Sequence, residues 1–586
     1  MRRILCLSLI FFSLAGLASA QAPLRPKHAK HAMVVSVHEL ASQAGVDALR
    51  RGGNAVDAAV ATGFVLAVVH PQAGNIGGGG FMLVRFADGE THFVDYREKA
   101  PAAATRDMYI GGPNSKNAGK PDPNLSLVGY KSIAVPGSVA GMYFAHNKWG
   151  KLKWASLLAP AIRLAREGFR LSWEDADDLR DPEVKELADF PTSKRIFLRN
   201  PLRNGRPYEQ GDVLRQPELA RTLERLARDP MEFYKGRMAR EIAAFIQKGG
   251  GLVTADDLAK YEVKIRRPVR GRYRGYEIIG APPPSSGGIT LIETLNILEG
   301  YDLASLGSRS ADSMHLTIEA LRRAFYDRAD LLGDSDFAQL PVAQLLDKKY
   351  AEAWRASIDP MRATPSNELK RPPFEGMDVS ARLRPPGVNI REPEHTTHYS
   401  IVDAHGNAVA VTTTLNDSFG SRVTVDKLGF LLNDEMDDFT SAPGAPNTYG
   451  LIQGEANVIQ PGKRPLSAMA PTMVLKDGKL FLVLGTPGGP RIISTVANIL
   501  MGVIDHSLDV QQAVTAPRFH HQWTPDEVRI ERYGFSPDTL RLLAARGHKL
   551  LIKGYWSDGE CIMIDPKSGE LLGATDPRGN GRALGY

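Results

Sequence analysis

The sequence predicts an α+β fold that is stabilised by a large hydrophobic core. Of the 586 residues, 43% are hydrophobic and only 24% are charged, a balance typical of globular proteins. Segments rich in β-branched residues, which favour strands, are interspersed with segments bounded by helix-capping residues. Of the two cysteines, Cys6 lies in an N-terminal leader, so Cys561 has no intramolecular partner and no disulfide framework is expected.

The first residues have the pattern of a secretory signal peptide. Arg2 and Arg3 precede a largely apolar run that ends in Ala-Ser-Ala, a typical cleavage site, and the run is too short for a comfortable membrane span. We therefore expect residues 1–20 to be removed, so that the mature chain begins at Gln21. The mature protein is expected to be periplasmic or secreted and to have no membrane span.

The charge of the chain is mild for its size. The formal net charge is +6, and loss of the two leader arginines reduces it to +4, because the leader contains no acid. The densest basic run, 266–274, alternates arginine with Gly271 and Tyr273 in its second half, as a solvated strand face does. We favour that interpretation over a nucleic-acid groove, and we expect no nucleic-acid partner.

The N-terminal part is expected to combine strands with buried helices. A strand is predicted at 33–37, followed by a helix at 38–51 that ends at Gly-Gly. Asn54 is a candidate cap for the next helix, 55–69, whose small and aliphatic residues imply burial on nearly all sides. A glycine tract at 74–80 leads into a strand. Close backbone packing explains this tract better than dinucleotide binding, which needs the glycines between a strand and a helix.

Further elements follow along the chain. A strand at 93–96 ends at Arg97, which is either a surface ion-pair partner or a cation directed into a pocket to hold a carboxylate. A rigid proline-rich loop at 282–288 opens a helix. Helices are expected at 138–148, 154–167, 217–228, 240–247, 254–261, 289–299, 313–332 and 342–357.

A predicted β-hairpin carries a candidate nucleophile. β-Branched segments at 400–402 and 408–414 flank a His-Gly-Asn turn, and the two arms carry Thr396 and Thr414. The preceding segment, 360–394, is rich in proline and is expected to be flexible. This arrangement suits a self-cleaving precursor, because a freed N-terminal threonine carries its own base, an α-amine of pKa about 7.7 to 8.0. A plain threonine-rich hairpin is the structural alternative.

Three later segments are candidates for a role in binding or catalysis. Four acids within 431–439 suit a hard cation or an ammonium group, and the lack of further ligands at loop spacing argues against a metal. The segment 441–462, rich in glycine and proline around Tyr449, is either a lid or a passive connection. A strand at 479–484, a glycine turn and a helix at 491–504 either cradle an oxyanion or form a plain connection.

Together these motifs resemble the γ-glutamyltranspeptidases from about residue 28 to the end of the chain. The resemblance implies an N-terminal-nucleophile hydrolase with an αββα sandwich. It also implies self-cleavage between His395 and Thr396 into a large subunit, 21–395, and a small catalytic subunit, 396–586, which remain associated as a heterodimer. The motifs that carry the resemblance lie at 74–80, 282–288, 396–400, 436–439, 465–467 and 487–489.

The resemblance implies a role for each matching residue. Thr396 would be the nucleophile and Thr414 would orient it, while Gly488 and Gly489 would donate backbone hydrogen bonds to the oxyanion. Tyr449 would belong to a lid loop. The residues implied to bind the α-carboxylate of a γ-glutamyl group are Arg97 and Ser467, and those implied to bind its α-ammonium are Asn416, Glu435 and Asp438.

The implied reaction transfers a γ-glutamyl group from glutathione or a related compound to water, an amino acid or a dipeptide. No metal and no organic cofactor is implied. Two departures from the family pattern bear on the donor range: Ala468 stands where a second serine is usual, and Pro490 replaces a small hydroxylated residue. One alternative is an acylase for glutaryl or cephalosporin-type amides, which needs no ammonium site. The other is a non-catalytic periplasmic protein that binds glutamyl peptides.

Overall fold

The computed structural model describes residues 24–111, 119, 122–180, 182–199, 205–373, 396–440 and 450–586. Several predicted features lie outside these ranges: the signal peptide 1–20, residues 374–395 with His395, and Tyr449 of the predicted lid. Within the ranges, no helix is both long enough and apolar enough to cross a membrane.

Two seven-stranded sheets, both antiparallel, form the centre of the described structure. In order, the first consists of β19 (Arg582–Gly585), β2 (Met33–Ser36), β10 (Thr396–Val402), β11 (Ala408–Thr414), β3 (Gly79–Arg85), β4 (Thr91–Asp95) and β7 (Lys264–Arg266). The second consists of β1 (Lys27–Ala29), β18 (Leu571–Thr575), β17 (Glu560–Ile564), β13 (Lys479–Leu484), β12 (Thr472–Lys476), β9 (Tyr276–Gly280) and β8 (Val269–Tyr273).

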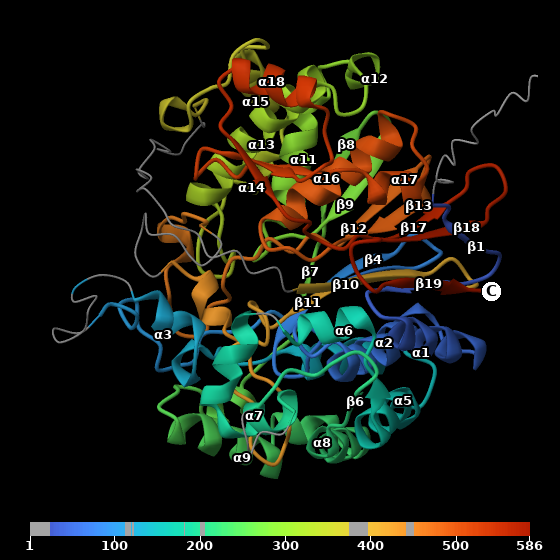
Figure 1. Cartoon of the computed structure of the whole chain (residues 1–586), viewed down its shortest axis with the longest axis vertical. Coiled ribbons are helices and arrows are strands. Elements are labelled where there is room, and N and C mark those ends of the chain that lie inside the picture. Colours follow the sequence, from blue (N-terminus) through green and yellow to red (C-terminus); the bar gives the residue numbers. More distant parts are fainter. Residues whose placement is uncertain are drawn as a thin grey trace, which may run out of the picture.

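Each face of the first sheet packs into a different hydrophobic core. On β2, Val34 belongs to the core shared with one helical layer, whereas its neighbour Val35 belongs to the core shared with the second sheet, because successive side chains of a strand point to opposite faces. The helices against the first sheet include α1 (Glu39–Arg50) and α2 (Ala55–Val69), and those against the second include α11 (Gly287–Leu298) and α16 (Arg491–Ile504). The layers follow one another as helix, sheet, sheet, helix (Figure 1), which confirms the predicted αββα sandwich.

Most predicted helices are confirmed. The predicted ranges 154–167, 217–228 and 491–504 coincide with α5 (Trp154–Glu167), α8 (Pro217–Arg228) and α16. Further helices in the described ranges are α3 (Pro123–Leu127), α4 (Ser138–Trp149), α6 (Trp173–Asp178), α7 (Pro191–Phe197), α9 (Arg237–Lys248), α10 (Ala255–Ala259), α12 (Leu303–Leu306), α13 (Ala311–Leu331), α17 (Val510–Thr515) and α18 (Pro537–Ala545). Two small sheets contain β5 (Phe169–Arg170), β6 (Val213–Leu214), β14 (Phe519–His520), β15 (Val528–Glu531) and β16 (Leu550–Lys553).

The prediction of one helix at 342–357 was wrong. The structure has α14 (Val342–Leu345) and then α15 (Lys348–Ala356). Asp347 has extended backbone angles, and its side chain accepts a hydrogen bond of 2.7 Å from the Lys349 amide. Because aspartate satisfies the free amides at a helix start, this residue begins a new helix within an otherwise helical pattern.

Two of the last three arginines in the basic run 266–274 lie on a solvated strand face, as predicted, whereas the third, Arg274, lies in the following turn and pairs with the buried Asp505. Arg270 and Arg272 of β8 are exposed, while Val269 and Tyr273 are buried. Arg270 forms an ion pair with Glu277 of the neighbouring β9.

The glycine tract packs backbone against backbone, also as predicted. A Cβ atom on Gly77 would lie 2.1 Å from the Leu431 carbonyl oxygen, and one on Gly78 would lie 2.1 Å from that of Thr414. A side chain at Gly78 would displace the hairpin that carries Thr414, and one at Gly77 would displace the segment around Leu431.

The capping of α2 gives a test of the fold. The Asn54 side chain accepts hydrogen bonds from the amides of Val56 and Asp57, at 3.0 and 3.1 Å. We predict that Asn54→Ala lowers the free energy of unfolding by about 1 to 2 kcal/mol, whereas Asn54→Ser, which keeps a capping oxygen, costs less. Calorimetric melting of both variants measures the difference. Equal destabilisation would contradict the capping explanation, since both variants lose the bond from Asn54 to the Trp149 carbonyl.

Candidate active site

Thr396 is held at the end of a central strand. It is the first residue of β10, which pairs with β2 on one side and with β11 on the other. In the β10–β11 register Thr396 lies opposite Thr414, and their Oγ1 atoms are 3.2 Å apart. The predicted hairpin is therefore confirmed, and it brings the two threonine hydroxyls into hydrogen-bond contact.

Asn416, two residues after the end of β11, hydrogen-bonds the Thr414 hydroxyl. Its backbone amide donates to Thr414 Oγ1 at 2.9 Å, and its side-chain amide donates to the Asp434 carbonyl at 3.2 Å. Asn416 has φ of +83°, a left-handed conformation that asparagine tolerates better than most residues. Because Thr414 Oγ1 accepts from this amide, its own hydrogen can be donated toward Thr396 Oγ1.

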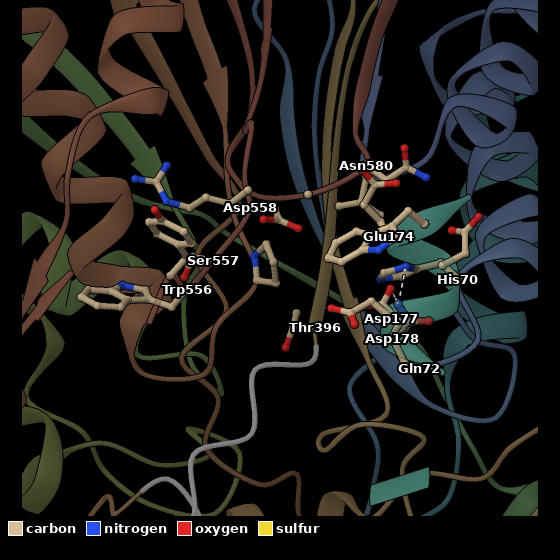
Figure 2. A pocket seen from close by; sticks show the side chains of 17 residues that line it. His70, Gln72, Glu174, Asp177, Asp178, Thr396, Trp556, Ser557, Asp558 and Asn580 are labelled. Carbon is tan, nitrogen blue, oxygen red and sulfur yellow. Dashed lines mark hydrogen bonds between the residues drawn. The ribbon is translucent and has the colours of Figure 1, made fainter. Parts of the chain in front are cut away.

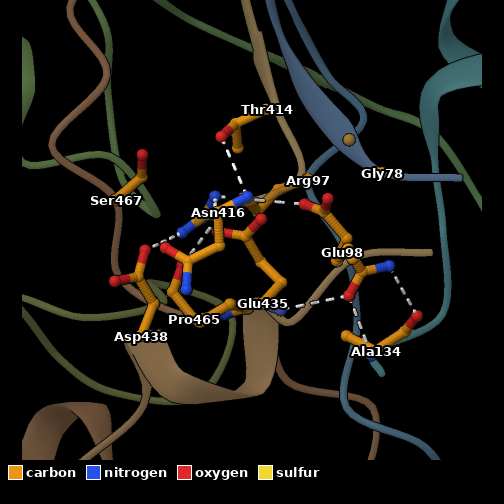
Figure 3. Close-up of polar contacts among 12 residues, drawn as sticks. Gly78, Arg97, Glu98, Ala134, Thr414, Asn416, Glu435, Asp438, Pro465 and Ser467 are labelled. Atoms are coloured by element: carbon orange, nitrogen blue, oxygen red, sulfur yellow. Dashed lines mark hydrogen bonds and ion pairs between the residues drawn. The ribbon is translucent and has the colours of Figure 1, made fainter. Parts of the chain in front are cut away.

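Arg97 lies at the centre of a buried cluster of charges. Its guanidinium pairs with the carboxylate of Glu435 and with Asp438 Oδ2, the latter at 2.5 Å (Figure 3), and its Nε donates to the Pro465 carbonyl at 3.3 Å. The Arg97 side chain is only 1% exposed. The surface ion pair considered from the sequence is thus wrong, and the alternative, a cation directed into a pocket, is confirmed.

Burial and charge act in opposite directions on this cluster. Burial lowers the pKa of Arg97, but the carboxylates of Glu435 and Asp438 outweigh it and raise that pKa, so Arg97 stays cationic. Burial raises the pKa of Glu435, and Arg97 opposes this shift. Burial also raises the pKa of the nearby Glu98 carboxyl to about 7. Three acids thus lie around one arginine in a place where water cannot screen their charges.

Two loops complete the walls of the same cavity. Ser467 Oγ accepts a hydrogen bond of 3.0 Å from the Met469 amide. In the turn between β13 and α16, Gly488 and Gly489 have φ of +124° and +56°, which favours glycine at both positions. The turn is confirmed as strand, glycine turn and helix, whereas its role as an oxyanion site stays a prediction.

The predicted residues meet around one small cavity next to Thr396. Its volume of about 20 Å³ leaves room for little more than one water molecule. A glutamyl group can therefore enter only if the polar side chains exchange their present contacts. The cavity is lined by Arg97, Arg328, Thr396, Thr414, Asn416, Glu435, Asp438, Leu451, Ser467, Ala468, Met469, Gly489, Pro490 and Ile492. Gly488 is not among these lining residues, but it directly precedes Gly489 in the sequence.

A larger cleft reaches Thr396 from another side. It has a volume of about 220 Å³, and Figure 2 shows Thr396 between two walls, one with His70 and Asp178 and the other with Trp556 and Asp558. The sequence analysis did not identify these wall residues. The available signal was the run Trp-Glu-Asp-Ala-Asp-Asp of α6, which is unusually acidic and aromatic for a short helix.

Comparison with known proteins places the chain in a family. A family model described as gamma-glutamyltranspeptidase matches residues 41–586. A glutathione hydrolase proenzyme of Escherichia coli is 48% identical over 554 residues, which cover 94% of this chain and 91% of that protein. An acylase ACY 1 proenzyme of a Pseudomonas species is 37% identical over 560 residues, which cover 95% of this chain and 94% of that protein.

Solved structures agree with this placement. The cephalosporin acylase from Bacillus halodurans superposes with a TM-score of 0.82 at 28% identity, over 97% of this chain and 98% of that one. The γ-glutamyltranspeptidase of Helicobacter pylori superposes with a TM-score of 0.57 at 41% identity, over 61% of this chain and 100% of that one. The chain belongs to the γ-glutamyltranspeptidase family and is an enzyme of the N-terminal-nucleophile hydrolase class, so the non-catalytic alternative is wrong.

Proposed function

We propose that this enzyme cleaves γ-glutamyl amides, glutathione among them, through an acyl-enzyme on Thr396. The observation that carries the proposal is the cavity in which the Thr396–Thr414 pair meets Arg97, Glu435 and Asp438. A γ-glutamyl group offers one carboxylate and one ammonium at a fixed separation, and the cavity offers both arginine and carboxylate side chains. The name of the similar glutathione hydrolase proenzyme agrees with this donor.

Maturation cuts the bond between His395 and Thr396 and gives the subunits 21–395 and 396–586. The first sheet supports this division, because β10, β11 and β19 from the small subunit are hydrogen-bonded to β2 and β3 from the large one. The second sheet is mixed in the same way, since β12 pairs with β9 and β18 pairs with β1. The subunits therefore stay together after the cut. The prediction of a flexible segment at 360–394 is wrong for its described part, because Ser366 is buried and Arg371 forms buried ion pairs with Asp327 and Asp330.

The chemistry follows from a free amine on Thr396. This α-amine, with a pKa of about 7.7 to 8.0, removes the proton from Oγ1, which attacks the γ-carbonyl carbon. Thr414 orients the attacking oxygen, and the backbone amides of Gly488 and Gly489 stabilise the oxyanion. The amide C–N bond then breaks, the leaving amine takes the proton, and a γ-glutamyl ester remains. Water or an acceptor amine attacks this ester and restores Thr396.

Donor recognition is an exchange of ion pairs. The α-carboxylate takes a place on Arg97 and Ser467, and the α-ammonium takes the place that Arg97 vacates beside Glu435 and Asp438, with Asn416 as a further partner. A glutaryl group lacks the ammonium, so it would draw Arg97 away from the two acids and give them no cation in return. This charge balance favours a γ-glutamyl donor over the acylase alternative.

The larger cleft receives the leaving group and the acceptor. It opens beside Thr396, and its acidic lining, which includes Glu174, Asp177 and Asp558, attracts an amine in its cationic form. Amino acids and dipeptides fit this description.

The loop 441–462 with Tyr449 acts as the lid of the donor side. A signal peptide at 1–20 directs the enzyme to the periplasm or the medium.

Self-cleavage gives the first test of this function. Wild-type protein is expected to separate into two bands on denaturing electrophoresis, and N-terminal sequencing of the smaller band should begin Thr-Thr-His. Thr396→Ala should leave one uncut chain and lower activity by on the order of 10³-fold or more. Thr397→Ala is the matched control, because its side chain points to the opposite face of β10 and its hydroxyl has no hydrogen-bond partner among the described residues. Normal cleavage of the Thr396 variant would remove Thr396 from its role.

The donor gives the second test. The processed enzyme should prefer γ-glutamyl-p-nitroanilide to glutaryl-p-nitroanilide in kcat/KM by on the order of 10⁴-fold, because a site built to bind a polar group leaves its own buried polar groups unpaired when the substrate lacks that group. Asp438→Asn should narrow this preference, because it removes one of the two acids. A higher kcat/KM for the glutaryl compound would identify the enzyme as an acylase.

A further inference from the structure

A second arginine, Arg328, lines the donor cavity beside Arg97. It projects from α13, is 1% exposed, and was not identified from the sequence, where it is one of several arginines in a long helix. Its Nε donates to Ser286 Oγ at 2.8 Å. Its Nη1 is buried and has no hydrogen-bond partner among the residues that the structure describes.

The two cavity arginines differ in their neutralisation. Arg97 contacts two carboxylates directly, whereas Arg328 forms no ion pair with any residue in the described ranges. Asp438 is close enough to raise the pKa of Arg328, but burial dominates and lowers that pKa to about 10, so the side chain is still cationic at neutral pH. A buried charge without a partner is costly, and proteins keep one where a ligand supplies the opposite charge.

Arg328 is also tied to the loop that is implied to hold the α-carboxylate. Ser286 Oγ accepts from Arg328 and donates to the Ser467 carbonyl at 2.6 Å. One hydroxyl thus connects the guanidinium to the backbone of Ser467. The next residue, Ala468, lines the cavity without a hydroxyl of its own. The guanidinium therefore lines the same cavity as the position at which this chain lacks a hydrogen-bond donor.

We propose that Arg328 is a second binding residue for the α-carboxylate of the donor and that it compensates for the missing hydroxyl at Ala468. This inference rests on the proposed donor site. The geometry agrees with it: both guanidiniums line the cavity that the donor would enter, and the one on Arg328 has no carboxylate partner among the described residues. A donor without the α-carboxylate would add an uncompensated positive charge.

The test compares two anilides that differ only in the α-carboxylate, γ-glutamyl-p-nitroanilide and 4-aminobutyryl-p-nitroanilide. For the processed Arg328→Gln heterodimer we expect KM for the γ-glutamyl compound to rise about 10- to 100-fold with kcat changed far less, and KM for the 4-aminobutyryl compound to stay constant or fall. Adding Ala468→Ser to this variant should lower KM for the γ-glutamyl compound part of the way back to the wild-type value. An equal rise in KM for both compounds, or no rise for either, would overturn the inference.

Two further variants keep the result interpretable. If Arg328→Gln is not processed, Arg328→Lys decides, because it keeps the charge but loses the forked geometry: a rise in KM confined to the γ-glutamyl compound supports the inference, and any other result overturns it. Arg97→Gln tests the donor site itself. If Arg97→Gln leaves the ratio of the two KM values unchanged, the proposed donor site is wrong. If Arg97→Gln changes the ratio and the Arg328 variants do not, only the role of Arg328 is wrong.

Discussion

The antiparallel ladder around β10 fixes the chemistry of this enzyme. Thr396 begins that strand and lies opposite Thr414 of β11, while β2 pairs with the later residues Tyr399–Val402 of the same strand. A cut before Thr396 breaks one peptide bond and leaves both pairings in place. The hydroxyl that lies 3.2 Å from Thr414 in the intact chain can thus keep its place when the α-amine is released.

The ladder also determines where charge can be buried. Gly78 lets the backbone just before β3 approach the Thr414 carbonyl at the end of β11, and β4 of the same sheet ends two residues before Arg97. A buried ion pair contributes little net stability, because the cost of removing both charges from water offsets their attraction. The cluster of Arg97, Glu435 and Asp438 is therefore better explained by recognition of a charged ligand than by folding.

Local signals made much of the fold predictable. Turn chemistry and β-branched residues located the hairpin, and Asn54 located the start of α2 at Ala55. The break at Asp347 was missed, because a capping residue inside an apolar periodic segment looks like an ordinary polar residue of a helix.

The site was predictable only in part. Sequence alone left the environment of Arg97 open, because its burial depends on residues more than 300 positions later in the chain. The resemblance to a family supplied those partners. Arg328 carried no signal at all, since its lack of a counter-charge exists only in the folded cavity.

The same fold serves γ-glutamyl hydrolases and acylases, so the donor must be selected by a small difference. A similar glutathione hydrolase and a similar acylase each cover more than 90% of this chain. A γ-glutamyl group brings both charges into the cavity, whereas a glutaryl group adds only a negative charge beside Glu435 and Asp438. Water is largely excluded there, so an unbalanced charge costs far more than it would at the surface. One amino group on the donor is therefore enough to separate the two activities without any change in the sandwich.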